Sequence, residues 1–316
     1  MNMLVVGLQY GDEGKGRVSH VFSKEHEWCV RFNGGPNAGH TVFNNGIIHK
    51  LHHLPAGSVL GKKVALDSGM VINLPRLLEE CSKNGIDPSS LWVSKNVHLI
   101  QEEHEVQDSL TASNFGSTKK GIAPVYASRA LKNGTRVGDT KPDVPSHPFK
   151  VYSGLVPVQT GESVLFESAQ GVMLDVDYGH YPWVTSSSVF PSSLYQIHTK
   201  IGVMKAYTSR VGEGPPYLPE VEGLSEKGQE VGTTTGRRRK CYWLIEDEIK
   251  YAISVFRPTE IVVTKLDILR DMEIKIWRGN SMVSIGNLDS YKDYLLSTFP
   301  SIFHFSESPD GDLISV

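Results

Sequence analysis

A glycine-rich segment near the start of the chain, Gly7 to Arg17, gathers residue types that phosphate chemistry uses. It follows an apolar run, Met3 to Val6, whose length and β-branched content predict a short buried strand. The pattern from Val18 to Ser23 then favours a helix. In a strand–loop–helix unit of this kind, backbone N–H groups and the helix N-terminus can hold a phosphate.

Three charged side chains in this loop extend that chemistry. Lys15 would add a positive charge to the phosphate-binding loop, and Asp12 and Glu13 supply carboxylates that can bind Mg²⁺ or accept a proton. The segment is not a Walker A motif, because Lys15 is followed by Gly16 rather than by Ser or Thr. Taken alone, it is equally well a glycine-rich turn with a solvated charge cluster.

A second cluster of glycines and polar groups, Asn33 to Thr41, favours the functional interpretation. The two clusters together resemble the adenylosuccinate synthetase family, whose members carry Gln-(Trp/Tyr)-Gly-Asp-Glu-Gly-Lys-Gly and Asn-Ala-Gly-His-Thr. Here these motifs correspond to Gln9–Gly16 and Asn37–Thr41. The resemblance implies an α/β fold with a mostly parallel central sheet, formed as a single catalytic domain over residues 1–316. It also implies loops gathered at the C-terminal edge of the sheet and a homodimer.

Composition argues against several classes of protein. A chain of 316 residues can bury a substantial core, and its net charge of −3 does not indicate a protein that coats nucleic acid. We expect no membrane span and no signal peptide, because no apolar run is long enough and the N-terminus lacks the charged-then-apolar layout. The three widely spaced cysteines favour free thiols in a reducing cytoplasm.

Local patterns predict several further elements. A helix is predicted over Leu74–Lys83, with Asn73 as its N-cap. Other segments are predicted as a strand, an exposed helix with a solvated acidic face, a proline-rich linker and a peripheral layer of strand and helix: Leu91–Ile100, Glu102–Ala112, Lys141–Pro157 and 270–300, respectively.

Further matches to the family imply a site for a purine 5′-monophosphate. The loop 116–124 could be any mobile surface loop, but the resemblance implies that Thr118 grips the 5′-phosphate. Gln170 is implied to face the base, although a buried, satisfied amide is the alternative. Ser168 stands beside it where the family has glycine, which would add a hydroxyl near the base. The remaining implied contacts are Asn37, Thr185 and, from the neighbouring subunit, Lys132, with Arg129 and Arg136 as substitutes.

A basic loop, Arg237 to Lys240, follows three threonines. Four adjacent cations are costly to place together unless an anion lies among them, although a solvated basic turn would also explain them. The family uses this loop to clamp the carboxylates of aspartate, where guanidinium groups form bidentate bonds. The resemblance therefore implies that aspartate is bound by Thr234, Thr235, Arg237 and Arg239.

The donor nucleoside triphosphate is implied to bind at two places. The first is the glycine loop, and the second is the tip of a buried strand, Ile261–Thr264, which ends in Lys265-Leu266-Asp267. The family's companion loop near the C-terminus, Ser-Thr-Gly-Pro-Asp, is altered here to Ser306–Asp310, so a preference for guanine is not implied. The implied donor contacts are Gly14, Lys15, Gly16, Thr41, Lys265, Asp267, Ser308 and Pro309.

The resemblance implies a reaction that replaces the C6 oxygen of a purine by the amine of aspartate. Asp12 would accept the N1 proton and bind Mg²⁺, with the Gly39 carbonyl as a second ligand of the metal. His40 would stabilise charge on O6 or the transferring phosphoryl group, and Lys15 would hold the β- and γ-phosphates. A nucleotide-binding regulator without catalysis is the alternative from another class, and the intact acid–base residues argue against it.

The acceptor purine is left between two choices. Cellular members of the family use IMP and GTP, whereas some viral members use dGMP with ATP or dATP to make 2-aminoadenine nucleotides. The short chain, Ser168, Glu213 near the ribose and the altered donor loop favour dGMP. The intact Asp12 argues against it, because some viral members carry Ser or Gly there.

Overall fold

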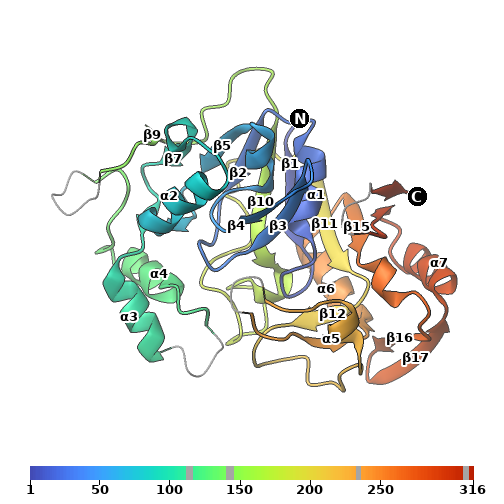
Figure 1. Ribbon diagram of the computed structural model, residues 1–316. Coiled ribbons are helices and arrows are strands. Elements are labelled where there is room, and N and C mark those ends of the chain that lie inside the picture. Colours follow the sequence, from blue (N-terminus) through green and yellow to red (C-terminus); the bar gives the residue numbers. More distant parts are fainter. Residues whose placement is uncertain (112–116, 140–145, 233–235, 309–312) are drawn as a thin grey trace.

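The computed structural model describes residues 1–111, 117–139, 146–232, 236–308 and 313–316. Within these residues, the centre of the molecule is a ten-stranded sheet (Figure 1). All neighbouring strands in it pair in parallel except the terminal pair, which is antiparallel. In spatial order the strands are β19 (Ile314–Ser315), β18 (Ile302–Phe305), β15 (Glu260–Thr264), β11 (Thr199–Lys205), β1 (Met3–Gly7), β10 (Val164–Gly171), β2 (Trp28–Arg31), β5 (Lys63–Leu66), β7 (Trp92–Ser94) and β9 (Lys150–Tyr152). The predicted α/β class is confirmed.

The central position of β1 follows from its sequence. Val5 and Val6 are fully buried, and the strand lies between β10 and β11. Continuous apolar runs of this kind are typical of parallel strands that are covered on both faces. The carboxyl ends of β1, β10, β11 and β15 meet at one edge of the sheet, where ligands bind in folds of this class.

Helices lie over the sheet and beside both of its ends. In Figure 1, α1 and the β3–β4 hairpin lie over the central strands, α3 and α4 lie together at one end, and α7 lies with β16 and β17 at the other. The helices are α1 (Lys15–Ser23), α2 (Leu74–Lys83), α3 (Glu102–Thr111), α4 (Ile122–Ala130), α5 (Leu224–Lys227), α6 (Glu246–Phe256) and α7 (Leu288–Thr298). Short 3₁₀ turns are η1 (Ala56–Leu60), η2 (Pro88–Ser90), η4 (Val172–Leu174) and η5 (Leu266–Leu269).

In the part of the chain that the structure describes, four small sheets complete the fold. They are the hairpin β3–β4 (His40–Asn44, Ile47–Leu51), the parallel pair β6–β8 (Val71–Ile72, His98–Leu99), the antiparallel pair β12–β13 (Thr208–Arg210, Lys240–Tyr242), and β14–β16–β17 (Leu244–Ile245, Ile274–Arg278, Ser281–Gly286). The last of these, with α7, confirms the strand and helix predicted for 270–300.

Local sequence patterns predict some of these elements correctly and one of them wrongly. Helix α2 has the predicted bounds, and the Asn73 side chain accepts a hydrogen bond from Arg76 N at 3.1 Å. The single strand predicted over Leu91–Ile100 is instead two short strands, β7 and β8, in different sheets. A turn separates them, closed by the bond from Val97 N to Ser94 O at 3.0 Å.

The acidic face of α3 is only partly solvated, which corrects the prediction. Glu102 and Glu103 are exposed, but Asp108 is buried and accepts hydrogen bonds from Gly121 N (2.9 Å) and Ser117 Oγ (2.8 Å). Glu105 lies within ion-pairing distance of Arg76, at 3.0 Å. These carboxylates therefore tie α3 to α2 and to the start of α4.

Two other expectations concern the linker and the thiols. Part of the predicted linker lies in the described residues, where β9 adds an edge strand to the main sheet. The three cysteines, Cys29, Cys81 and Cys241, are free, as predicted, and all three are buried. Within the described residues, no helix has both the length and the apolar character that a membrane crossing requires.

Candidate active site

The loop from β1 to α1 takes a shape that depends on left-handed backbone at three positions. Gly11 (φ +85°), Asp12 (φ +59°) and Gly14 (φ +89°) all adopt it. Gly14 caps α1, so Lys15 and Gly16 form the first turn of the helix, where N–H groups point out unpaired by the helix itself. The Thr264 hydroxyl at the end of β15 donates to Glu13 O at 2.6 Å and fixes the loop against the sheet. The loop is therefore shaped to receive a phosphate.

Glu13 is an internal anchor of this loop, which corrects its predicted use as a metal or proton-accepting carboxylate. Its side chain is fully buried. It accepts hydrogen bonds from Gln9 N (3.1 Å) and Gly11 N (2.8 Å), and it pairs with Lys15 Nζ at 2.6 Å. A Cβ at Gly7 would lie 2.2 Å from a Glu13 carboxylate oxygen, so the glycine makes room for the carboxylate.

Asp12 is held differently. Its side chain is 35% exposed, and its Oδ2 lies 2.7 Å from Nη2 of Arg239. Arg239 is buried and also pairs with Glu230 through Nη1, at 2.6 Å. The structure therefore brings together the predicted proton acceptor and one of the predicted aspartate-binding arginines.

A buried cluster behind Arg239 was missed by the sequence analysis. Glu230 accepts hydrogen bonds from Lys205 Nζ, 2.8 Å from each of its carboxylate oxygens, and from the Tyr207 hydroxyl at 2.5 Å. Burial would raise the pKa of Glu230, but Lys205 and Arg239 lower it to about 2. The available signal was Lys205 itself, since a lysine that ends an apolar strand is rarely buried without a partner.

The basic loop is neutralised by the protein's own carboxylates, which weakens the charge argument for an anion there. Arg238 pairs with Glu220 at 2.8 Å and with Glu226 at 3.4 Å. Arg237 is exposed, and its carbonyl accepts a hydrogen bond from Gly232 N at 2.8 Å. The predicted aspartate contacts Thr234 and Thr235 lie outside the described residues.

His40 begins β3 and is buried against α1 rather than open to the site. Its Nδ1 lies 3.4 Å from a Glu167 oxygen, and its Nε2 lies 3.2 Å from Arg31 Nη1. Burial, together with the charge of Arg31, lowers the pKa of His40 well below its usual range. A Cβ at Gly16 would lie 2.8 Å from the His40 Cβ. The imidazole is therefore neutral and packed directly on the first turn of α1.

Gln170 lies between the two glycine clusters at the end of β10. Its backbone is left-handed (φ +58°), and its Cα would be 3.6 Å from a Cβ at Gly11. Its amide would lie 3.4–3.5 Å from a Cβ at Gly34. The Gln170 Oε1 atom is buried and has no hydrogen-bond partner within the described residues. An unpaired buried amide oxygen disfavours the satisfied-amide alternative.

The other predicted monophosphate contacts are less closely connected. Asn37 accepts a hydrogen bond from Gly35 N at 3.0 Å, and Thr185 N donates to Leu174 O at 2.8 Å. Thr118 is half-buried just before α4. Lys132 is exposed, with φ +64°, in the turn that follows α4.

Ser168 faces the protein interior, which corrects its predicted place beside the base. It is fully buried, and its hydroxyl donates to Val189 O at 2.7 Å and lies 2.9 Å from Ala169 O. Glu213 is exposed and lies 3.6 Å from the Lys240 ammonium. The Ser168 hydroxyl is thus engaged by the backbone and is not aimed into the site.

The donor-base region joins the end of β15 to the C-terminal loop. Lys265 is left-handed and donates to Gly228 O at 3.2 Å, and Asp267 lies half-buried in η5. Arg17, which the sequence analysis did not single out, reaches from α1 to Ser306 Oγ at 2.7 Å and to the Ser308 carbonyl. Pro309 lies outside the described residues, and Thr41 is exposed on β3.

A metal ion would find few protein ligands here. The described residues contain no group of three or more His, Cys, Asp or Glu side chains arranged to hold one. Asp12 offers a partly exposed carboxylate, and Gly39 a half-buried backbone segment. One carboxylate and a carbonyl fit Mg²⁺, which keeps waters and phosphate oxygens as its other ligands.

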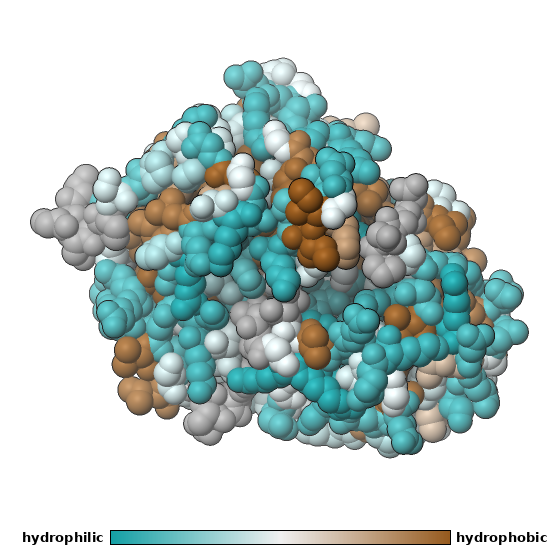
Figure 2. All heavy atoms as spheres, in the orientation of Figure 1, coloured by the Kyte–Doolittle hydropathy of each residue, from teal (hydrophilic) through white to brown (hydrophobic). Residues whose placement is uncertain are grey.

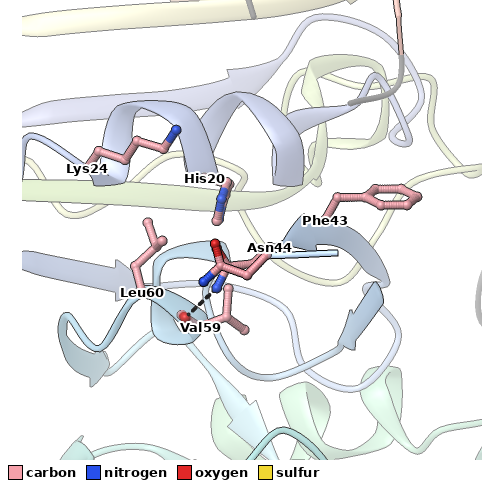
Figure 3. Close-up of a pocket in the computed structure, with 7 residues that line it drawn as sticks. His20, Lys24, Phe43, Asn44, Val59 and Leu60 are labelled. Atoms are coloured by element: carbon pink, nitrogen blue, oxygen red, sulfur yellow. Dashed lines mark hydrogen bonds between the residues drawn. The ribbon is translucent and has the colours of Figure 1, made fainter. Parts of the chain in front are cut away.

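A separate polar pocket of about 530 Å³ lies behind the hairpin (Figure 3). In Figure 3 the His20 ring points toward Asn44, whose amide bonds the Val59 carbonyl at 2.9 Å, while Lys24 and Phe43 point away. The pocket contains none of the predicted site residues.

Figure 2 shows a mostly hydrophilic face with small apolar groups scattered over it.

Comparisons with known proteins show the family. The family model for adenylosuccinate synthetase matches residues 4–147 and 156–283. The adenylosuccinate synthetases of Helicobacter pylori (strain G27) and Paramecium tetraurelia are each 35% identical, over 84% and 86% of this chain and 79% and 78% of their own.

Solved structures show the same fold. The fully ligated adenylosuccinate synthetase from Plasmodium falciparum has a TM-score of 0.88 at 26% identity, covering 99% of both chains. The cyanophage S-2L succinoaminodeoxyadenylate synthetase (PurZ), bound to dGMP and dATP, has a TM-score of 0.78 at 23% identity, covering 99% of this chain and 95% of that one. The chain described here belongs to the adenylosuccinate synthetase family of ligases that form C–N bonds.

Proposed function

We propose that the chain joins L-aspartate to C6 of a purine 5′-monophosphate through a 6-phosphoryl intermediate, while a nucleoside triphosphate is converted to the diphosphate and phosphate. The ion pair between Asp12 and Arg239 carries the proposal. It joins Asp12, which would accept the proton and lies just before α1, to Arg239, which would bind a carboxylate of aspartate. Each of the two chemical steps then has a group in place.

In the first step the N1 proton passes to Asp12, and O6 attacks the γ-phosphorus as the bond to the leaving diphosphate breaks. Amides of the loop and the Lys15 ammonium hold the phosphates. In the second step the aspartate amine attacks C6, and inorganic phosphate leaves with the former O6. Both steps depend on positioning and charge stabilisation.

His40 takes part by donating to the transferring phosphoryl group. Its ring must first turn away from Arg31, because Nε2 faces that guanidinium at 3.2 Å. A neutral imidazole with an N–H toward the substrate is suited to this role, since it gives up no proton. Glu167, 3.4 Å from Nδ1, orients the ring.

Mg²⁺ would be held by Asp12 and the Gly39 carbonyl together with phosphate oxygens, where it would neutralise phosphate charge. Gln170, Asn37, Thr118 and Thr185 would bind the monophosphate, and Thr234 and Thr235 the aspartate. Lys132 would enter the partner's phosphate site in a homodimer, for which its exposed position after α4 is suitable. The free, buried thiols fit a reducing cytoplasm.

For the acceptor we propose dGMP, with ATP or dATP as the donor. Support comes from the donor-base loop, where the Ser308 carbonyl is bonded by Arg17 and the family's Ser-Thr-Gly-Pro-Asp is altered. The S-2L enzyme was solved with dGMP and dATP, although its likeness to this chain concerns the fold. Ser168 gives no support, because its hydroxyl faces the interior.

The second candidate is the ordinary pairing of IMP with GTP. It is favoured by the curated relatives, which are adenylosuccinate synthetases at 35% identity, and by the intact Asp12. Regulatory binding without catalysis has no such support.

Phosphate release with aspartate and Mg²⁺, crossing IMP, GMP and dGMP with ATP, dATP and GTP, tests all three readings. Turnover of dGMP with an adenine donor is the expected result. Turnover confined to IMP and GTP would replace the acceptor assignment. Nucleotide binding without turnover in any pairing would overturn the enzymatic proposal.

A further inference from the structure

We propose that Glu230 is a positioning residue, which anchors one edge of the Arg239 guanidinium so that the opposite edge is presented first to Asp12 and then to a carboxylate of the aspartate substrate. The inference rests on the proposed function, and it assigns roles to Glu230, Lys205 and Tyr207 beyond the motif residues.

Arg239 is shared between two carboxylates. Its Nη1 donates a hydrogen bond to Glu230 at 2.6 Å, and its Nη2 lies 2.7 Å from Asp12 Oδ2 in an ion pair. The buried Nε has no hydrogen-bond partner within the described residues. A guanidinium takes a carboxylate best with two parallel N–H groups, such as Nε and Nη2. Asp12 therefore uses one of the two donors on this edge, and an aspartate carboxylate could use both.

Glu230 can serve as an anchor because it is itself immobilised. It is 1% exposed, and Lys205, equally buried, donates to both of its oxygens at 2.8 Å. The Tyr207 hydroxyl donates to Glu230 at 2.5 Å, and Lys205 also bonds Ser209 Oγ at 2.6 Å. The Glu230 carboxylate thus has bonds from Lys205 at the end of β11 and from Tyr207 just after it, while β12 holds Lys205 in turn, so Glu230 cannot follow Arg239 if the guanidinium moves.

The backbone adds a second connection at the same place. Arg239 N donates to Glu230 O at 2.8 Å, and Val231 forms an isolated bridge with Arg238. Glu230 and Val231 are therefore joined to Arg238 and Arg239 through the backbone as well as through side chains.

Stability alone is a poor reason for such a cluster. Burying an ion pair costs desolvation that its attraction often fails to repay, so apolar side chains of similar size would stabilise the fold at least as well. Four charges alternate in sign along one series of ion pairs, from Lys205 to Glu230, then to Arg239 and finally to Asp12. This arrangement is explained if the Arg239 guanidinium has to be held in place while its carboxylate partner changes from Asp12 to the aspartate substrate.

The test is steady-state kinetics of Glu230→Gln, which keeps the shape and removes the charge. We expect the KM for aspartate to rise at least about tenfold, the effect of losing one hydrogen bond to a charged group. We expect the KM values of the two nucleotides to change less than about twofold. Glu220→Gln is the matched control, because it removes an exposed partner of the neighbouring Arg238 and should leave all KM values unchanged.

An unchanged KM for aspartate in Glu230→Gln would overturn the proposal. A fall in kcat and in thermal stability together with a similar rise in all KM values would overturn it too, because it would show a purely structural role. If Glu230→Gln does not fold, the double variant Lys205→Met/Glu230→Met removes the Lys205–Glu230 pair and leaves Arg239 paired with Asp12, and the same rise in KM is expected.

Failure of the proposed function would be visible separately. If wild type turns over no acceptor, calorimetric binding of aspartate to the monophosphate complex still compares wild type, Glu230→Gln and Glu220→Gln. Weakened binding only in Glu230→Gln would support the anchor. Equal binding in all three, or none in wild type, would overturn it.

Discussion

Asp12 Oδ2 and Arg239 Nη2 lie 2.7 Å apart, and this contact joins the loop after β1 to the loop before β13. Asp12→Asn keeps the side-chain shape but removes both the proton acceptor and the anion that faces Arg239. We expect kcat to fall at least about 10³-fold, because general base catalysis and charge positioning are lost together. Single-turnover phosphate release measures this.

The control for that variant is Asp87→Asn. Asp87 is exposed and caps η2 by accepting from Ser89 N at 2.9 Å, and asparagine caps equally well. Its kcat should match wild type. An Asp12→Asn enzyme that retained a tenth of the activity would remove Asp12 from the catalytic role.

Gly16→Ala should displace His40. The added Cβ would lie 2.8 Å from the His40 Cβ and 2.9 Å from Nδ1, closer than real contacts allow. We expect kcat to fall about 10²-fold, the cost of misplacing a catalytic group by roughly 1 Å. Nucleotide-dependent turnover, measured beside the thermal unfolding curve, checks this.

Gly46→Ala, at the tip of the same β3–β4 hairpin, is its control. An added Cβ there meets nothing within 4 Å, although φ is +78°. This variant should lose about 1–2 kcal/mol of stability from backbone strain and keep its kcat. Equal kcat in the two variants would show that the position of His40 does not matter.

Ser168→Ala should leave the choice of purine unchanged. The Ser168 hydroxyl satisfies the buried Val189 carbonyl at 2.7 Å, so its removal costs about 1–3 kcal/mol of unfolding free energy. The ratio of kcat/KM for dGMP to that for IMP should stay within about twofold of wild type, since the hydroxyl does not face the site. A shifted ratio would restore Ser168 as a determinant of specificity.

Glu248 should make stability depend on pH. Tyr10 donates to it at 2.6 Å, and its second oxygen, Oε2, has no hydrogen-bond partner within the described residues. Burial raises the pKa of Glu248 from 4.5 to about 7, while the Tyr10 hydrogen bond and Arg210 oppose the shift. The protonated carboxyl therefore stabilises the fold fully below pH 4.5, and this contribution is lost as pH rises through about 7.

Between these pH values the loss amounts to at most about 3 kcal/mol. Glu248→Gln cannot ionise, so its unfolding free energy should fall less than that of wild type between about pH 4.5 and pH 8. Urea unfolding at several pH values measures the difference. Parallel pH curves for the two proteins would contradict the shifted pKa.

Local patterns and motif likeness predict different parts of this molecule. Helix α2 and its Asn73 cap are set by neighbouring residues, so the sequence predicts them to the residue. The split of 91–100 into two strands depends on partners far along the chain, which local patterns do not contain. The match of Asp12 and Arg239 to family motifs predicts that both belong to the site, but not that they bond each other.

Residues outside recognisable motifs were the harder part. Glu230 and Lys205 lie in segments with no composition signal of their own, and their meaning arises only when β11 and the base of the aspartate loop pack together. Ser168 was misplaced for another reason: residues two apart in a regular strand share a face, but Gln170 has left-handed backbone (φ +58°), so its direction does not predict that of Ser168. The direction in which a side chain points, unlike its residue type, can be known only from the backbone conformation.

The Glu13 carboxylate has one more consequence. Because it binds two amides of its own loop and the ammonium of Lys15, the loop has an internal counter-ion and keeps its curvature when no nucleotide is present. A phosphate bound in this loop, as proposed, would compete only for Lys15 and would not have to order the backbone, so little conformational entropy would be lost on binding. The shape of this loop is thus preorganised by the protein's own Glu13 carboxylate.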